Sequence, residues 1–406
     1  MSRSNLSFRP NIVWIVTTQW RFSATGYRKD KNARTPHLDE LARIATDFVQ
    51  AVTPHPMGPQ ARAALLTGRL SPANGVNDYW DALPPQQTTI SHFLRQKGYA
   101  TSFFGKWHLG KRSKLDPLVG EEAAKILISP DSRGGFNFWE GFESGFLLND
   151  PWLHGTRIPQ PKLFKGYQAD ILVQRALEWI DDSSRVPFFC VVSLEGPHPP
   201  YGVPALNIQK TDPNSILLRS NVPLGGAIEQ RARAELSGYY AHIEATDRCI
   251  GKLITELDFN NTIVVFTSVH GDMHGSHGVF RKAWPYEESV RVPLLVSDFL
   301  SGNKVRRNES PVSLADLPDM AVAWAEGREW KCGRDSALIS MPVAMTIPLQ
   351  CDRAWRGIRS PRHKLILNAD GSPWLYFDLE NDPFEMKNLV GESLRTGEVD
   401  RMRQLL

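Results

Sequence analysis

The stretch PHPMGPQARAALLTGR, from Pro54 to Arg69, says more about this chain than any other part of its 406 residues. Its second half, RAALLTGR, is an apolar run that we expect to form a helix starting near Arg62. Its first half contains Gly58, and glycine has no side chain to oxidise, to hydrate or to attack a substrate with. The nearest cysteine is Cys190. Position 58 therefore offers no nucleophile.

Bulk composition and charge exclude several classes of protein. A hydrophobic content of 41% supports a sizeable buried core, in one large domain or two modest ones. Lys and Arg total 47 and Asp and Glu total 44, so the net charge is +3, without long runs of one sign. We therefore expect neither nucleic acid nor a membrane as a partner.

The cysteines and the N-terminus indicate a reducing compartment. Cys190, Cys249, Cys332 and Cys351 lie far apart without a CxxC pair, which argues against a zinc knuckle or a disulfide scaffold. We expect reduced, mostly buried thiols. The apolar run at residues 11–16 is too short for a secretory signal or a membrane span. The sequence therefore predicts a cytoplasmic protein.

Apolar, β-branched runs alternate with amphipathic segments, which is typical of an α/β sheet with helices on both faces. We expect strands at residues 11–16, 100–104, 187–194, 262–268 and 290–297. Helices are expected over residues 35–49 and over residues 229–257, the second with a buried apolar stripe. Residues 129–161 are rich in Pro and Gly and indicate surface loops. Ligands of such sheets bind beyond the carboxyl ends of the strands.

The pattern changes near residue 335. RAWRGIRSPRHKLILN and SPWLYFDLENDPFEMKNL indicate short hairpin strands followed by a terminal helix. We therefore expect residues 1–334 to form an α/β domain that carries the functional site. Residues 335–406 should form a small antiparallel subdomain.

On these motifs the chain resembles the type I sulfatases of the alkaline phosphatase superfamily. Their signature is C-x-P-x-R, an apolar helix and then T-G-R, and residues 62–69 match its second half. The alignment puts Gly58 at the cysteine that becomes the formylglycine nucleophile, and Gln60 at the proline. The C-terminal LYFDLENDPFEMKNL also resembles the family pattern. The resemblance covers nearly the whole chain and implies a mixed sheet flanked by helices, with a small C-terminal antiparallel subdomain.

Two further departures from the family pattern concern its metal site. TTQWR, at residues 17–21, stands where similar sulfatases tend to have T-D-Q-Q-R, so Thr18 replaces a metal-binding aspartate. FTSVHGDMHGSHG stands where FTSDHGDMLGDHG is common, so Val269 replaces a second one, while His270 is kept. A hydroxyl is a far poorer ligand than a carboxylate for a hard cation. We therefore expect no calcium and no other cofactor.

The resemblance leaves the basic part of the family's site in place. GKWHLG supplies Lys106 and His108, and the PHPP segment supplies His198. Lys282 and Arg62 match further anion-binding positions. Together with His270, these residues are our candidate catalytic set. Substrate binding is expected from Arg62, Lys106, Lys282, Gln19 and His277.

The replacement of the metal-binding carboxylates should leave the pocket with a positive charge. Without the acidic cage, Arg62, Lys106 and Lys282 should form a pocket that attracts sulfate, phosphate or carboxylate. Neighbouring cations should lower the pKa of His108 and His198, and so favour a neutral imidazole that can act as a base.

A second interpretation gives the site a transition metal. His274 stands where the family often has leucine, and His55 precedes the missing nucleophile. With His270 and His277 they could form a nitrogen-rich site for zinc or another transition metal.

Three functions are compatible with these residues. The first is an enzyme that has kept the anion pocket and performs acid/base chemistry on a sulfated, phosphorylated or carboxylated small metabolite, such as elimination, rearrangement or transfer. The second is a catalytically silent relative that binds an anionic ligand or a partner protein. The third is an ordinary sulfatase, against which Gly58, Thr18 and Val269 argue.

Overall fold

The computed structural model describes residues 9–183, 185–301 and 306–406, and the N-terminal lead, residues 1–8, lies outside them. The elements of the large sheet are distributed over most of the chain. They are β1 (Asn11–Thr17), β2 (Thr46–Phe48), β3 (Ala100–Lys106), β4 (Phe138–Phe142), β5 (Trp152–Gly155), β6 (Lys162–Leu163), β7 (Phe188–Ser193), β8 (Thr262–Ser268), β9 (Leu294–Ser297) and β10 (Arg306–Asn308). The C-terminal strands are β11 (Ala337–Met341), β12 (Trp355–Arg359), β13 (His363–Asn368) and β14 (Pro373–Asp378).

The helices connect these strands. They are α1 (Pro36–Ile44), α2 (Gly58–Thr67), α3 (Ile90–Gln96), α4 (Glu121–Ala124), α5 (Gln168–Asp182), α6 (Ala227–Thr255), α7 (Glu287–Val290), α8 (Leu317–Ala325) and α9 (Thr396–Arg403). None of the described helices is long and apolar enough to cross a membrane.

The large sheet is mixed, with a parallel centre. Its strand order is β10-β2-β9-β8-β1-β7-β3-β4-β5-β6. The five strands from β8 to β4 in that order run parallel, and β9 and β5 pair antiparallel to either side of them. Nearly every residue of β1, β7 and β8 is buried, as expected for strands that are covered on both faces. The carboxyl ends of β1, β3, β7 and β8 therefore lie along one edge of the sheet.

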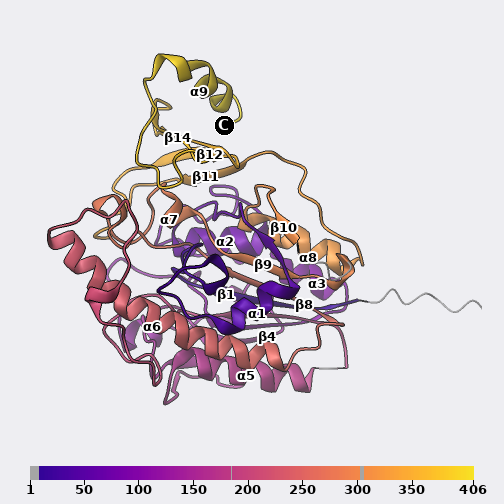
Figure 1. Cartoon of the computed structure of the whole chain (residues 1–406). Helices are drawn as coiled ribbons and strands as arrows, with labels where there is room; N and C mark the ends of the chain where they lie inside the picture. The colour runs from indigo at the N-terminus through magenta and orange to yellow at the C-terminus, as the bar shows by residue number, and fades with distance from the viewer. Residues whose placement is uncertain (1–8, 184, 302–305) are drawn as a thin grey trace, which may run out of the picture.

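Two layers of helices cover the sheet (Figure 1). On one face, α1, α5 and α6 enclose a core that includes Ile15, Val192 and Phe266. On the other face, α2, α3 and α8 pack over a core that includes Trp14 and Phe189. The side chains of successive residues in β1 thus alternate between the two cores.

The C-terminal strands form a separate antiparallel sheet, ordered β11-β12-β13-β14, which stands beside the main body in Figure 1. A buried ion cluster joins it to α7. The guanidinium of Arg359 in β12 donates to both carboxylate oxygens of Glu287, at 3.1 and 2.9 Å. Lys364 in β13 donates to the same carboxylate at 3.2 Å. The Glu287 backbone N–H donates to Glu385, at 2.7 Å.

The predicted fold class is confirmed: a large mixed sheet with helices and a small C-terminal antiparallel sheet. The expected central strands and the long helix α6 are present. The expected helix over residues 35–49 was wrong in its second half, because the helix ends at Ile44 and β2 follows it. The expected surface loops at 129–161 contain β4 and β5, which extend the sheet at its edge.

Two smaller expectations are also resolved by the structure. The strand expected over residues 290–297 begins only at Leu294, because Val290 ends α7. All four cysteines are free, and Cys190, Cys249 and Cys351 are buried, as predicted for reduced thiols.

We predict that Glu287→Gln lowers the free energy of unfolding by about 3–5 kcal/mol, because it leaves Arg359 and Lys364 buried with less compensating charge. Burial alone would raise the pKa of Glu287, but Arg359 and Lys364 hold it far below its usual range. Urea unfolding at pH 7 measures the change. Glu40→Gln, in an exposed pair with Arg43, is the control and should leave the midpoint nearly unchanged. Equal effects of the two substitutions would contradict a structural role for the cluster.

Candidate functional site

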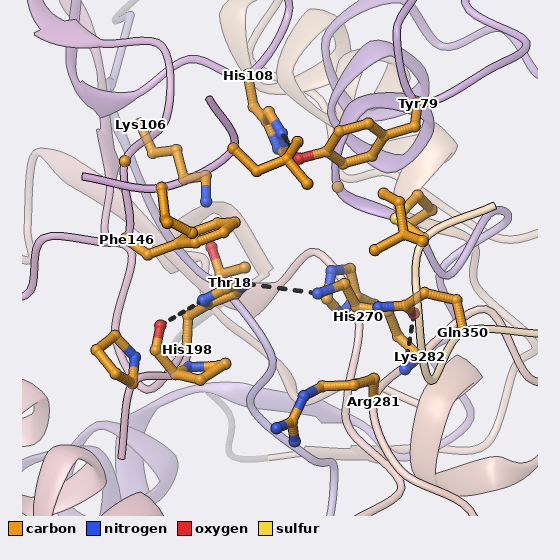
Figure 2. Close-up of a pocket in the computed structure, with 18 of the residues that line it drawn as sticks. Thr18, Tyr79, Lys106, His108, Phe146, His198, His270, Arg281, Lys282 and Gln350 are labelled. Carbon is orange, nitrogen blue, oxygen red and sulfur yellow. Dashed lines mark hydrogen bonds between the residues drawn. The ribbon is translucent and has the colours of Figure 1, made fainter. Parts of the chain in front are cut away.

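A cavity of about 500 Å³ opens beyond the carboxyl ends of the central strands. Thr18 follows β1, Lys106 ends β3, His198 follows β7 and His270 follows β8. The cavity therefore lies where an α/β sheet is expected to bind ligands. Figure 2 shows these side chains around it, with Lys106 and His270 on opposite sides. Its lining also includes Met57, Gly58, Tyr79, His108, Leu118, Val119, Gly120, Gly145, Phe146, Leu147, Pro199, Pro200, Arg281, Lys282, Ile347, Pro348 and Gln350.

Gly58 is the first residue of α2, and the imidazole of His108 fills the space beside it. A Cβ atom built on Gly58 would lie 2.7 Å from His108 Nδ1, closer than real Cβ contacts come, and 3.1 Å from Cε1, which is a tight contact. On its other side, His108 Nε2 lies 3.2 Å from the Tyr79 hydroxyl. The guanidinium of Arg112 covers the Tyr79 ring, 4.6 Å from its centroid. The His108 ring thus lies between the Tyr79 hydroxyl and the backbone of Gly58.

Lys106 is held in a buried ion pair. Its Nζ lies 2.6 Å from Glu195 Oε1, and both side chains are at most 1% exposed. Gln168 donates from Nε2 to the other carboxylate oxygen of Glu195 at 3.0 Å. The expectation that Lys106 lacks an acidic partner was therefore wrong. Glu195 comes from the loop after β7 and takes that place.

Arg62 lies behind the cavity wall rather than in it. Its guanidinium donates to Thr18 Oγ1 at 2.9 Å, to Ser193 Oγ at 2.6 Å and to the Lys106 carbonyl at 3.1 Å. Thr18 in turn donates to the Leu194 carbonyl at 3.1 Å. Among the described residues, no carboxylate forms an ion pair with Arg62 at hydrogen-bonding distance. Its charge reaches the cavity through Thr18.

Lys282 and His198 meet at another side of the cavity. Lys282 Nζ donates to Gln19 Oε1 at 2.7 Å and lies 3.4 Å from His198 Nε2. Gln19 donates from Nε2 to Asp272, which also accepts from the Tyr201 hydroxyl at 2.9 Å. A chain of polar contacts thus connects the cavity to the buried Asp272.

The tautomers of two histidines follow from their backbone contacts. His198 Nδ1 lies 2.7 Å from the Pro199 carbonyl, and His270 Nδ1 lies 2.9 Å from the Gly271 carbonyl. Because a carbonyl only accepts, each Nδ1 carries the proton in the neutral ring. Each Nε2 is then an acceptor, and that of His270 has no hydrogen-bond partner although it is buried.

Phe146 forms an aromatic wall over two of these groups. Its ring stacks on His198 with centroids 4.4 Å apart, and Lys106 Nζ lies 4.5 Å from its centroid. Phe146 has a φ of 56°, and Gln19, His108 and Arg281 also have left-handed backbones. Such conformations cost free energy in non-glycine residues and tend to occur at functional sites.

The titratable groups of the cavity are shifted toward their neutral forms. Burial, followed by the charges of Arg112 and Lys106, holds the pKa of His108 well below its usual value. Burial and then Lys282 do the same to the pKa of His198. Burial also lowers the pKa of Lys282 to about 7. The predicted lowering of the histidine pKa values is confirmed, although burial is a larger cause than the neighbouring cations.

Val269 and Thr18 are the two residues that the sequence resemblance matched to metal-binding carboxylates. The Val269 side chain is fully buried in the apolar core under α2. The Thr18 hydroxyl already donates to Leu194 and accepts from Arg62. His270 supplies one unpartnered nitrogen beside them.

The four histidines of the transition-metal interpretation have different surroundings. His55 donates from Nδ1 to the Ser340 carbonyl at 3.1 Å and accepts from the Ser71 N–H at 3.0 Å. His274 packs against the Tyr239 ring, with centroids 4.4 Å apart. His277 stacks on Tyr286, with centroids 4.0 Å apart. Of the four, His270 alone lines the cavity.

His277 belongs instead to a different group of side chains. Its ring lies near Glu288 and Glu385, with one possible ligand atom of each residue within 4.8 Å of the others. Glu288 is paired with Arg219 and Glu385 with Lys364. These cations already balance both carboxylates. Neither His277 nor Gln19, two of the expected substrate-binding residues, is among the residues that line the cavity.

Several cavity residues carried no signal in the sequence motifs. Tyr79, Phe146, Glu195, Arg281 and Gln350 come from segments between or beyond the motifs. Glu195 stands three residues before His198, after a buried strand, and its position after a strand end was the one available signal. Phe146 and Gln350 are brought in by tertiary packing.

Comparisons with known proteins agree with this geometry. The sulfatase family model matches residues 10–327. An ulvan-active sulfatase from Formosa agariphila is 33% identical over 95% of this chain and 78% of its own length. An arylsulfatase from Clostridium perfringens is 25% identical over 98% of this chain and 94% of its own length.

Solved structures lead to the same family. A Bacteroides fragilis protein assigned to the sulfatases as yidJ superposes with a TM-score of 0.82 at 25% identity, covering 100% of this chain and 96% of its own. The phosphonate monoester hydrolase of Agrobacterium radiobacter has a TM-score of 0.74 at 20% identity, covering 98% and 94% of the two chains, and shares the fold. The family model, the relatives and the fold together place this chain in the sulfatase family.

Proposed function

We propose that this protein is a divergent sulfatase-family enzyme that binds an anionic small molecule and performs acid/base chemistry on it, without a formylglycine nucleophile or a calcium cage. The relatives are named for sulfate esters, so a sulfated metabolite is the first candidate, followed by phosphorylated and carboxylated ones. The observation that carries the proposal is the contact between Gly58 and His108. It supports the loss of the nucleophile because the imidazole occupies the space that a side chain at position 58 would need.

The residues at the cavity do not supply the oxygen ligands that a calcium ion needs. Ca²⁺ takes six to eight oxygen ligands, carboxylates above all. At the cavity, Val269 offers no ligand atom and the Thr18 hydroxyl is already engaged. The carboxylate of Glu195 faces Lys106, and that of Asp272 faces Gln19 and Tyr201. We therefore route no step of the reaction through a calcium ion.

The anion is proposed to bind between Lys106, Lys282 and the N-terminus of α2. Gly58 and Met57 bring the start of this helix to the cavity, and the first turn contains no acidic residue. The free N–H groups of a helix N-terminus favour negative charge, and Lys donates strong hydrogen bonds to anions. Arg62, behind Thr18, adds its charge at longer range.

Protons are proposed to move through two histidines. His198 is neutral, and its Nε2 can accept a proton from the bound molecule. When the Tyr79 hydroxyl donates to His108 Nε2, His108 Nδ1 carries a proton beside Gly58. The ring can pass this proton to the bound molecule while Nε2 takes the Tyr79 hydroxyl proton, which leaves a neutral imidazole and a tyrosinate beside Arg112. One base and one acid on different sides of the same cavity suit an elimination or a rearrangement, in which one proton is removed and another is added.

We predict that methanesulfonate, a monoanion, stabilises the protein and that Lys282→Gln weakens its binding at least tenfold, because the variant loses a charged donor at the cavity. Calorimetric titration at pH 6.5 and thermal shifts measure both effects. Lys114→Gln, an exposed lysine outside the lining, is the matched control and should bind like the wild type. No response to methanesulfonate or acetate would overturn the proposed anion site.

We predict that the affinity for methanesulfonate falls as the pH rises through about 7. The pKa of Lys282 is lowered to about 7 by burial, so the lysine loses its proton above that pH, and the anion prefers the protonated form. Asp272, Lys106, Arg281 and Glu195 are the charged groups that act on it. Titrations from pH 6 to 9 should show up to a tenfold loss per pH unit above 7. Lys282→Gln should flatten the profile, and an unchanged slope in that variant would refute the assignment.

We predict that Gly58→Ala lowers the free energy of unfolding by about 1–3 kcal/mol, because its methyl group would overlap the His108 ring. The loss should shrink in a His108→Ala background, and a double-mutant cycle by urea unfolding measures this coupling. Gly397→Ala, where nothing lies within 4 Å of the added atom, is the control.

Two outcomes would count against the proposal. An equal effect of Gly58→Ala in both backgrounds would mean that His108 does not fill the space. Hydrolysis of 4-nitrophenyl sulfate by the wild-type chain, lost in Lys282→Gln, would show an ordinary sulfatase reaction at this cavity.

A further inference from the structure

The walls and the floor of the cavity differ in chemistry. The polar groups Lys106, His108, His198, His270 and Lys282 come from segments at or after the carboxyl ends of the central strands, and we call this part of the cavity its polar end. The remaining walls come from four separate segments and are largely apolar. They consist of Met57, Leu118, Val119, Phe146, Leu147 and Ile347.

These walls offer few partners for a sugar ring. Each hydroxyl of a carbohydrate loses hydrogen bonds to water on burial and needs a replacement from the protein. Away from the polar end, the lining offers chiefly the Gln350 amide and the Arg281 guanidinium. Arg281 is already held by Glu235 through two hydrogen bonds, at 2.6 and 3.0 Å. An apolar ligand body, by contrast, needs no replacement for lost hydrogen bonds and gains from leaving water.

The charges of the polar end are nearly balanced before any ligand binds. Lys106 is paired with Glu195, and Arg281 with Glu235. Lys282 is linked through Gln19 to Asp272. Arg62 is left with neutral partners among the described residues.

Before a ligand binds, the positive charge of Arg62 is therefore the one that no carboxylate among the described residues balances. A single negative charge would neutralise it. A second negative charge would be buried without a partner, which is costly in a cavity of low polarity.

We infer that the ligand is a monoanion carried by a compact apolar body, such as the sulfate monoester or the carboxylate of an aromatic or alicyclic molecule, and not a sulfated sugar or a phosphate dianion. This inference rests on the proposed anion site and adds the kind of molecule to which the anion is attached. A cavity of about 500 Å³ has room for one or two rings.

Four probes separate the parts of this inference in calorimetric titrations. Benzenesulfonate carries one charge on an apolar ring, and glucose 6-sulfate carries one charge on a sugar. Phenyl phosphate at pH 6.5, where Lys282 keeps its proton, carries largely two charges on the same ring as the first probe, and methanesulfonate has almost no body. We expect benzenesulfonate to bind at least tenfold more tightly than each of the other three, compared at the same pH.

A pair of variants tests the apolar wall directly. Val119→Asn should weaken benzenesulfonate at least threefold and leave methanesulfonate unchanged. Leu115→Asn, on the same loop but 95% exposed and outside the lining, is the matched control. Both side chains are exposed enough for the variants to fold.

These titrations separate a wrong anion site, which would overturn the proposed function, from a wrong ligand body or a wrong ligand charge. If none of the four probes binds, the anion site itself is wrong. If glucose 6-sulfate binds as tightly as benzenesulfonate, or Val119→Asn has no effect, the apolar body is wrong while the anion site stands. If phenyl phosphate binds more tightly than benzenesulfonate at pH 6.5, the single charge is wrong.

Discussion

The arrangement of the cavity depends on the buried ion pair between Lys106 and Glu195. Two charges withdrawn from water are tolerated only when their geometry is close and their other atoms are satisfied. Here the contact is 2.6 Å, and Gln168 satisfies the second carboxylate oxygen. The pair ties the end of β3 to the loop after β7, which carries His198. It also cancels a positive charge, so that the cavity suits one negative charge rather than two.

The positions of the motifs could be predicted from sequence because the central strands are buried on both faces. Such strands appear as continuous apolar runs, and parallel strands bring their carboxyl ends to one edge. That reasoning placed Thr18, Lys106, His198 and His270 together correctly. It failed for β4 and β5, which lie toward the edge of the sheet, where short strands among Pro and Gly do not differ in pattern from loops.

The contacts of the site were harder to predict than its position. Motif matching grouped Arg62 with Lys106 and Lys282, but α2 begins at Gly58, so Arg62 is its fifth residue, and the Thr18 hydroxyl lies between its guanidinium and the cavity. Glu195 was missed because a single carboxylate after a strand has no periodic signal, and its partner Lys106 is 89 residues away. The histidines failed to converge for a related reason. The spacing of histidines along a loop does not determine which way their rings point. Each imidazole of the predicted metal site packs against a tyrosine ring or hydrogen-bonds to a backbone carbonyl instead.

The contact of Gly58 with His108 links the two halves of the site. The resemblance matches position 58 to a residue with a side chain, whereas here it is a glycine with the His108 ring beside it. Here His108 is held by Tyr79, and Arg112 lies over the tyrosine ring and pairs with Glu143 at 3.2 Å. A single substitution at position 58 would therefore meet a packed ring supported by three further side chains. The packing of this wall therefore supports the proposed loss of a nucleophile at position 58.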